Sequence, residues 1–202
     1  MWRRTITFLL SLLSMVMAEA TNHYFKHLGV SDGLSQVCIP SIYQDELGAV
    51  WLGTTEGLNR YNGKDVKVFQ PSESNHGLTN NEINELCGDK NGRMYIRSGN
   101  DLIKLDIYTE QFTCLRQKGV YGLFCKKDTL WVSCADGIYY YTGQGTELTF
   151  FARVQKGFVG RALYVDKETV WVVTRKYLVA ISREDPLRQE ILLTLDKGNC
   201  IL

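Results

Sequence analysis

Residues 29–33 form a Gly-x-Ser-x-Gly pattern that could present Ser31 as a nucleophile. That chemistry needs a strand before the serine and a helix after it, so that the hydroxyl is exposed and backbone N–H groups can stabilise an oxyanion. Here Asp-Gly-Leu-Ser leads toward another strand, and a glycine equivalent to Gly33 recurs along the chain. We therefore expect a turn at Ser31 rather than a catalytic site.

Residue types that bind metals are present, but without the spacing that a metal site requires. Asp89 and Asn91, followed by Gly92, resemble the start of a calcium-binding loop, yet Asn100 stands where the bidentate glutamate would be. The cysteines form no Cys-x-x-Cys pair. No two of the histidines form a metal-binding pair: His23, His27 and His76. We expect a hairpin turn at the Asp-x-Asn-Gly stretch and no metal site.

Acidic residues could serve a glycosidase, for example Glu56, Asp101 and Asp136, but their separation in space does not follow from the sequence. No phosphate-binding loop or dinucleotide-binding glycine pattern occurs. The net charge is +1, from 23 Lys and Arg against 22 Asp and Glu, without the clustered basic face that nucleic-acid binding requires. We predict no cofactor, no catalytic residue and no nucleic-acid partner in this region.

Residues 1–20 are predicted to be a signal peptide. A short basic start precedes an apolar run at residues 6–17, which is shorter than the roughly 20 residues that span a bilayer. Ala18-Glu19-Ala20 then places small residues before a cleavage site at Thr21. The alternative is an uncleaved anchor. The expected location of the mature chain is the periplasm.

Export leaves two states open for the six cysteines, which are buried thiols and a disulfide framework. Cys87 and Cys125 stand at matching places in the internal repeat of the chain, which suggests buried strand positions. Because cysteine is readily buried as a small apolar residue, we favour free thiols.

After Thr21 the chain repeats with a period of about 40 residues. Each unit has a turn, an aromatic residue in an apolar run, a polar or glycine break, and a second alternating run. The aromatic residues are 44, 36 and 40 residues apart: Trp51, Tyr95, Trp131 and Trp171. Upstream glycines recur at spacings of 44, 42, 38 and 41: Gly33, Gly77, Gly119, Gly157 and Gly198. The two registers share one period, which indicates a repeated structural unit.

Each unit is predicted to hold four short strands, because period-two alternation is interrupted by turns rich in Asp, Asn and Gly. In the first unit they fall at residues 37–44, 50–54, 57–61 and 66–70. Four antiparallel strands repeated at this period are typical of the blade of a β-propeller, whose neighbouring blades cover each other's faces. The predicted fold class is all-β, and the four recurring aromatic residues are assigned to the core between blades.

The first unit carries a dense set of motif residues: Gly33-Leu34-Ser35, Ile42-Tyr43-Gln44-Asp45, Gly48, Trp51-Leu52-Gly53-Thr54, Gly57-Leu58 and Arg60-Tyr61. This pattern resembles the repeat of two-component regulator propellers. The second unit repeats part of it: Gly77-Leu78-Thr79, Asp89, Gly92 and Leu102. The third and fourth units depart from it after Trp131 and Trp171, where the Gly-Thr pair is missing. The resemblance covers roughly residues 25–200.

The resemblance implies a seven-bladed ring, of which about four blades are present. The expected boundaries after the signal peptide, over residues 21–202, are 22–32 for a closing outer strand, 33–76, 77–118, 119–156 and 157–197 for blades, and 198–202 for the start of another. Residues 22–28 match the fourth strand of a blade, so we expect them to complete a blade from the far end of the ring and cover its edge. A closed ring of four blades is the alternative.

The loops between strands two and three, and those between blades, share one end of the channel in a propeller, and loops on a rigid scaffold commonly carry function. The polar residues predicted for this face are Ser35, Gln36, Thr55, Glu56, Asn80, Asn81, Asn100, Asp101, Arg161, Arg175 and Lys176. Hydrogen-bonding and charged groups of this kind suit a polar ligand such as an oligosaccharide.

The resemblance implies the periplasmic sensor of a hybrid two-component histidine kinase, common in glycan-degrading Bacteroidetes. Its expected partners are a glycan-derived oligosaccharide, the remaining propeller blades and, in the full-length protein, a second copy as a homodimer. The kinase would lie outside this region, which is expected to be non-catalytic. The alternatives are an exported propeller hydrolase or lyase acting on polysaccharide, and a bare protein-interaction scaffold.

Overall fold

The computed structural model describes residues 26–71, 77–154 and 159–194, which contain sixteen β-strands and one short 3-10 helix. The strands form four separate antiparallel sheets, each built from four strands that are consecutive in sequence. The all-β prediction and the four-stranded repeat are therefore confirmed. The predicted signal peptide and residues 198–202 lie outside the described residues.

Each sheet corresponds to one predicted blade. The first contains β1 (Ser41–Gln44), β2 (Val50–Thr54), β3 (Gly57–Tyr61) and β4 (Val66–Phe69). The second contains β5 (Ile83–Gly88), β6 (Arg93–Ser98), β7 (Asp101–Asp106) and β8 (Gln111–Arg116). The third contains β9 (Val120–Lys126), β10 (Thr129–Cys134), β11 (Gly137–Tyr141) and β12 (Thr149–Ala152). The fourth contains β13 (Val159–Val165), β14 (Thr169–Thr174), β15 (Tyr177–Ser182) and β16 (Gln189–Thr194).

The strands of the first blade lie close to their predicted positions, and the largest difference is the start of β1. The predicted strand began at residue 37, whereas β1 begins at Ser41. Pro40 directly precedes it and has no N–H to give to a ladder. Gln36 Oε1 instead accepts the backbone N–H of Cys38 at 3.3 Å, which holds the approach to β1 in a local turn.

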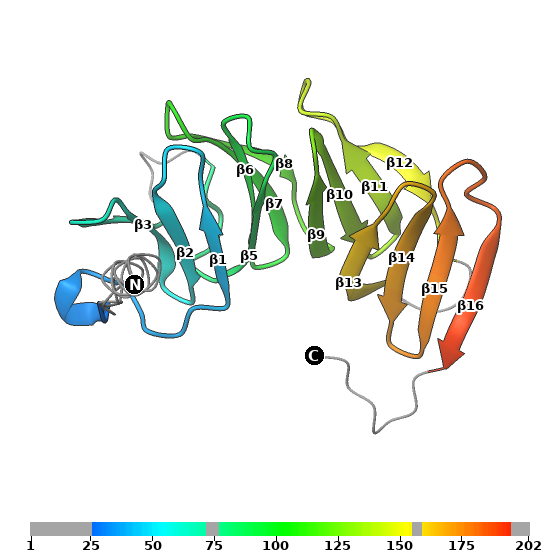
Figure 1. The fold of residues 1–202 in the computed structure, drawn as a ribbon, viewed down its shortest axis with the longest axis horizontal. Coiled ribbons are helices and arrows are strands. Elements are labelled where there is room, and N and C mark those ends of the chain that lie inside the picture. Colours follow the sequence, from blue (N-terminus) through cyan, green and yellow to red (C-terminus); the bar gives the residue numbers. More distant parts are fainter. Residues whose placement is uncertain (1–25, 72–76, 155–158, 195–202) are drawn as a thin grey trace, which may run out of the picture.

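The blades stand side by side along an arc, with the first strand of each blade beside the first strand of the next (Figure 1). β1 contacts β5, β5 contacts β9, and β9 contacts β13. The described part of the chain therefore has the strand order and the stacking expected for consecutive propeller blades.

The hydrophobic core is divided among the interfaces between blades. One cluster joins Trp51 of the first blade to Met94 and Ile96 of the second. The next joins Tyr95 of the second blade to Val132 of the third. Because alternate residues of a strand point to opposite faces, β6 supplies both clusters, and each blade shields its neighbours from water.

The core prediction is confirmed for three of the recurring aromatic residues and is wrong for the fourth. Trp51, Tyr95 and Trp131 are buried, at 0%, 0% and 4% exposure. Trp171 is only half-buried. Each aromatic faces the following blade, and within the described residues no sheet packs against the face of β14 that carries Trp171.

An aspartate fixes the turn between the first two strands of three blades. Asp45 Oδ1 accepts the N–H of Ala49 at 2.8 Å, and its Oδ2 accepts the indole N–H of Trp51 at 2.7 Å. Asp166 likewise accepts the N–H of Thr169 and the indole N–H of Trp171, each at 2.8 Å. The motif aspartate therefore ties the hairpin turn to the aromatic residue, and Asp89 accepts turn N–H groups in the same way.

The Gly-x-Ser-x-Gly stretch forms a turn, as expected. Ser31 lies in the 3-10 helix η1 (Val30–Asp32), and the described residues 26–29 before it have no regular structure. Gly33 ends the turn with a φ of 104°, in the left-handed region that favours glycine. The strand predicted for residues 22–28 is not present in its described part, residues 26–28, and the rest of it lies outside the described residues.

The described residues lack two features that mark other classes of protein. Across residues 26–71, 77–154 and 159–194, no helix is both long and apolar enough to cross a membrane. In the same ranges, no group of three or more His, Cys, Asp or Glu side chains is placed to hold a metal ion.

Candidate functional site

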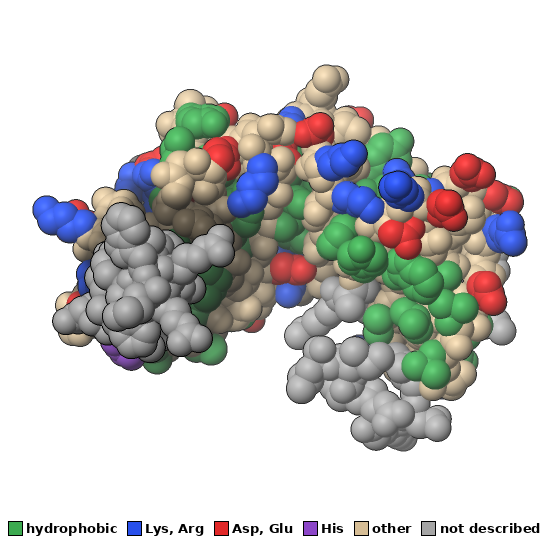
Figure 2. Space-filling view, in the orientation of Figure 1, with side chains coloured by type: hydrophobic (Ala, Val, Ile, Leu, Met, Phe, Trp, Pro, Cys, Tyr) green, Lys and Arg blue, Asp and Glu red, His purple; other side chains and the backbone are tan. Residues whose placement is uncertain are grey.

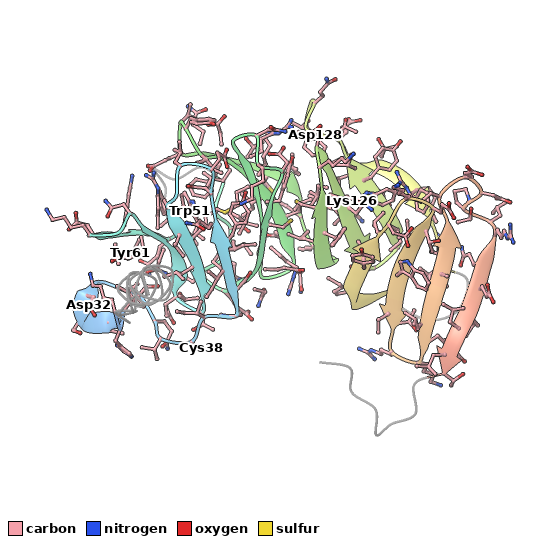
Figure 3. All side chains as sticks on the ribbon, in the orientation of Figure 1. Asp32, Cys38, Trp51, Tyr61, Lys126 and Asp128 are labelled. Atoms are coloured by element: carbon pink, nitrogen blue, oxygen red, sulfur yellow. The ribbon has the colours of Figure 1, made fainter. Side chains whose placement is uncertain are left out.

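One edge of the blades carries the turns between strands two and three together with the segments that lead into the first strands. We call this edge the loop face. In Figure 3 it lies at the lower edge of the first three sheets, where Cys38 is labelled, while Asp128 marks the opposite edge. Backbone hydrogen bonds connect its parts, as from Gly57 N to Asn81 O (2.8 Å) and from Ala135 N to Gly119 O (2.8 Å). The loop face is therefore held on a rigid frame.

Ser35 is tied into the first blade. Its hydroxyl lies 2.9 Å from the Thr54 hydroxyl, its N–H donates to Asn59 Oδ1 at 2.9 Å, and Asn59 Nδ2 donates to Ser35 Oγ at 2.8 Å. Asn59 and Thr54 are fully buried. The half-buried Ser35 side chain thus anchors the loop to β2 and β3, and the neighbouring Gln36 side chain folds back on its own backbone.

Thr55 and Glu56 project from the first turn of the loop face. Both are exposed, because the Thr54 hydroxyl holds the turn by donating to Gly57 O at 2.8 Å and accepting the N–H of Glu56 at 3.1 Å. The neighbouring segment brings Asn81 beside this turn through the bond from Gly57. Thr55 and Glu56 therefore present their side chains to solvent next to the boundary with the second blade.

Asn80, Asn81, Asn100 and Asp101 gather where the second blade meets its neighbours. Asn80 N donates to Ser98 Oγ at 3.0 Å, and the Asn80 side-chain oxygen accepts the N–H of Glu82 at 2.9 Å. The Asn100 carbonyl accepts the N–H of Val120 at 3.0 Å, and Asp101 Oδ1 accepts the N–H of Lys118 at 2.6 Å. The side chains of Asn80 and Asn100 are exposed, whereas the Asp101 carboxylate binds the segment that leads into the third blade.

The last three predicted residues divide between a turn and a strand. Arg175 and Lys176 are exposed in the turn between β14 and β15, which Thr174 holds by accepting the N–H of Tyr177 at 2.9 Å. Arg161 was predicted in a loop, but it lies within β13, so that assignment is wrong. β13 begins at Val159, so the strand starts earlier in the sequence than we predicted from the glycines of this stretch.

An ion pair beside the loop face was not foreseen from the sequence. Arg97, 8% exposed, lies in β6 with its Nε 3.3 Å from Glu85 Oε2, and it donates to Gly99 O at 3.1 Å. The same carboxylate oxygen accepts the N–H of Leu123 from the third blade at 3.1 Å. Arg97 stands at the repeat position that Gly53 occupies in the first blade. An arginine in place of this motif glycine was the feature of the sequence that could have indicated the ion pair.

A second charged cluster joins β8 of the second blade to the β10–β11 hairpin of the third blade at the same edge. Arg116 donates to Asp136 Oδ1 at 2.7 Å, the Tyr139 hydroxyl donates to Oδ2 at 2.7 Å, and Arg116 lies 4.6 Å from the centre of the Tyr139 ring. Burial acts to raise the pKa of Asp136, but the bonds from Tyr139 and Arg116 outweigh it and hold that pKa below its usual value. Asp136 is therefore an ion-pair partner rather than a proton donor.

Two buried amide oxygens at the loop face have no partner among the described residues. They belong to Asn81, in the segment before β5, and to Asn84, within β5. Asn84 Nδ2 donates to Glu82 Oε1 at 2.7 Å, which orients that side chain. A buried acceptor without a donor costs free energy, so both positions are suited to a hydrogen bond from water or a ligand.

The loop face combines hydroxyl, amide and charged groups of both signs. Figure 2 shows the same mixture of Lys or Arg with Asp or Glu over the visible side of the molecule. Asp101 and Asp136 each have a structural partner, whereas Glu56 is exposed. The arrangement offers hydrogen bonds to a polar molecule, and among the described residues no three His, Cys, Asp or Glu side chains are grouped to hold a metal ion.

Known structures place this architecture among β-propellers. The fold is similar to the extracellular domain described as that of the hybrid two component system BT3049 from B. thetaiotaomicron, with a TM-score of 0.69 and 21% identity over 83% of this chain and 26% of that chain. It is also similar to the extracellular domain of BT4673 from the same organism, with a TM-score of 0.65 and 19% identity over 84% of this chain and 28% of that one. The described part of the chain is thus a run of propeller blades.

Sequence comparison gives a more particular assignment for the first repeat. Residues 33–56 match the family model described as two component regulator propeller. The chain is also 40% identical over 53 residues to histidine kinase P4 of Formosa agariphila, which covers 26% of this chain and 4% of that protein. The predicted resemblance to two-component regulator propellers is confirmed, and the chain spans only a small part of each of these relatives.

Proposed function

We propose that this chain is part of the extracytoplasmic sensor of a hybrid two-component histidine kinase, and that its loop face binds a glycan-derived oligosaccharide. The match at residues 33–56 and the similarity to extracellular domains of hybrid two component systems support the sensor role. The observation that carries the ligand proposal is the loop face itself, where exposed polar side chains stand on turns locked by hydrogen bonds between blades.

The chemistry of the loop face suits a sugar because many hydroxyl groups need both donors and acceptors. Thr55 and Asn100 offer both, Glu56 accepts, and Lys176 donates. Fixed loops reduce the conformational entropy lost on binding, which favours recognition of a flexible ligand.

The proposal includes the partners expected from the sequence. The half-buried Trp171 and the exposed Leu192, Leu193 and Tyr164 leave apolar surface on the fourth blade that further blades of the ring would cover. We further propose that the propeller lies in the periplasm, that the full-length protein is a homodimer, and that its kinase lies in the cytoplasm. Binding would act on the kinase only if the ligand has different affinities for two conformations of the dimer.

A binding experiment on the full-length protein tests the proposal. The protein is titrated with panels of neutral, acidic and sulfated oligosaccharides while its melting temperature and binding heat are recorded. A ligand at 100 times its dissociation constant stabilises the folded state by about 2.7 kcal/mol, so at least one panel should raise the melting temperature by a few degrees. Unchanged oligosaccharides after incubation, judged by mass spectrometry, would support a sensor over a hydrolase or lyase.

Two sets of variants localise the site. Thr55→Ala with Glu56→Ala should weaken oligosaccharide binding about 10-fold or more without altering the melting temperature of the free protein. Glu46→Ala with Lys64→Ala is the matched control, because both side chains are exposed at turns of the first blade outside the loop face. Equal effects of the two pairs, or no binding by any panel to the folded protein, would contradict the proposal.

A further inference from the structure

Two cysteines from neighbouring blades are in direct contact. Cys87 of β5 and Cys125 of β9 have their Sγ atoms 2.7 Å apart, with the Cys125 thiol donating to the Cys87 sulfur. They are 38 residues apart in the sequence. Both side chains are partly buried and pack against the core cluster between the second and third blades, which includes Tyr95 and Leu130.

We propose that Cys87 and Cys125 form a disulfide bond that joins the second blade to the third. The two strands that carry them lie side by side, so both thiols already face one another across the interface. A disulfide has a sulfur–sulfur distance of about 2.05 Å, and the two sulfur atoms, 2.7 Å apart, need only a small further approach to reach it. Among the described cysteines, the contact between two sulfur atoms is that of Cys87 with Cys125.

The chemistry requires an oxidant, and we assign this role to a small or protein-borne disulfide that exchanges with thiols. One cysteine thiolate attacks the donor disulfide, forms a mixed disulfide and releases the first donor thiol. The second cysteine thiolate then attacks the protein sulfur of that mixed disulfide and releases the second donor thiol. The two cysteines lose two protons and two electrons in total, and the donor disulfide is reduced to two thiols.

The remaining cysteines provide internal references. Cys134 is fully buried, and burial raises the pKa of its thiol to about 12, so we expect it to stay a thiol that reacts only after unfolding. Cys114 lies in the outer strand β8 and Cys38 is exposed before β1, in different parts of the blades. Burial also raises the pKa of Cys87 well above its usual value, which favours formation of the bond during folding over slow oxidation afterwards.

The bond would act as a covalent link between blades at the inner strands. Cross-linking residues 38 positions apart constrains the unfolded chain, and a native disulfide of this loop size typically raises the melting temperature by about 5–15 °C. The proposal depends on an extracytoplasmic location, where disulfides persist, and it does not depend on any ligand of the loop face. A failure of oligosaccharide binding would therefore leave it unaffected.

Peptide mapping of the exported full-length protein tests the proposal directly. The protein is unfolded in denaturant at slightly acidic pH with N-ethylmaleimide already present, so that buried free thiols are also blocked, and it is then digested with trypsin without reductant. The expected product is peptide 68–90, which carries Cys87, linked to peptide 119–126, which carries Cys125. Reduction should split this product, while peptides 105–116 and 128–153, with Cys114 and Cys134, should carry no link.

Variants give a second measurement. The melting temperature of the natural protein should fall by about 5–15 °C when reductant is added, and Cys114→Ser should show the same fall. The double variant Cys87→Ser with Cys125→Ser should be insensitive to reductant. Recovery of both cysteines as singly alkylated peptides, even after refolding in oxidised glutathione, would overturn the proposal whether or not the variants fold, and so would a link from either cysteine to another partner.

Discussion

Replacing Trp51 by phenylalanine removes a hydrogen bond from inside a blade interface while keeping an aromatic ring there. The Trp51 indole is fully buried and donates to Asp45 Oδ2 at 2.7 Å. Phenylalanine cannot donate, so that carboxylate oxygen would lose its side-chain partner. Asp45 Oδ1 would keep the N–H groups of Leu47 and Ala49, at 3.0 and 2.8 Å, so the turn itself should survive.

The expected loss of stability follows from two contributions. A hydrogen bond to a charged acceptor contributes about 1.5–3 kcal/mol, and the smaller ring leaves a void worth about 1 kcal/mol. Trp51→Phe should therefore lower the free energy of unfolding by about 2–4 kcal/mol. Trp171 donates to Asp166 at 2.8 Å with similar geometry, but it is half-buried, and water can replace the lost donor. Trp171→Phe should cost less than about 1 kcal/mol.

Urea unfolding followed by far-ultraviolet circular dichroism compares the two variants with the natural protein. Blades can unfold separately, so hydrogen exchange of the β2 and β14 amides should accompany it. Faster exchange is expected in β2 of Trp51→Phe, with little change in β14 of Trp171→Phe. Equal losses in the two variants would refute the reasoning, because they would show that burial between blades does not set the strength of this bond.

Two further predictions concern single contacts. Gly53→Ala should destabilise the protein by about 1–3 kcal/mol in urea unfolding, because a Cβ atom there would lie 2.8 Å from Ile83 Cγ2 of the next blade; an unchanged midpoint would contradict this close approach. The pKa of Asp166 is held below its usual value first by the Trp171 indole N–H and then by backbone N–H groups. A lowered carboxyl pKa stabilises the folded state above the usual aspartate pKa, and this contribution is lost as the pH falls through the lowered value. Trp171→Phe should raise the Asp166 pKa toward its usual range in a carboxyl NMR titration, and an unchanged value would rule out the assigned cause.

Much of the fold could be predicted because blade structure is local. Strand alternation, Asp and Gly turns and a period of about 40 residues are properties of short stretches, and they placed β2 and β3 at their observed bounds. The burial of Trp51 also followed from the repeat. Trp171 has the same local pattern, but its burial depends on a sheet packed against its face, which no local pattern reports.

The candidate site was predicted only in outline. The turn at Thr55 and Glu56 was located from strand ends, whereas the contact of Asn81 with that turn joins two blades. Arg161 was predicted in a loop but lies in β13, because the sequence at the start of this strand does not show a clear strand pattern.

The chain's own pattern of residues established an all-β array of four-stranded units and the edge on which its polar loops would gather. Only the packing of the blades revealed three features. They are the contact between the Cys87 and Cys125 thiols, the ion pair of Glu85 with Arg97, and the incomplete burial of Trp171. The physical reason is that hydrogen bonding within a blade joins residues a few positions apart, whereas contacts between blades join residues about 40 positions apart whose pairing depends on how two twisted sheets stack.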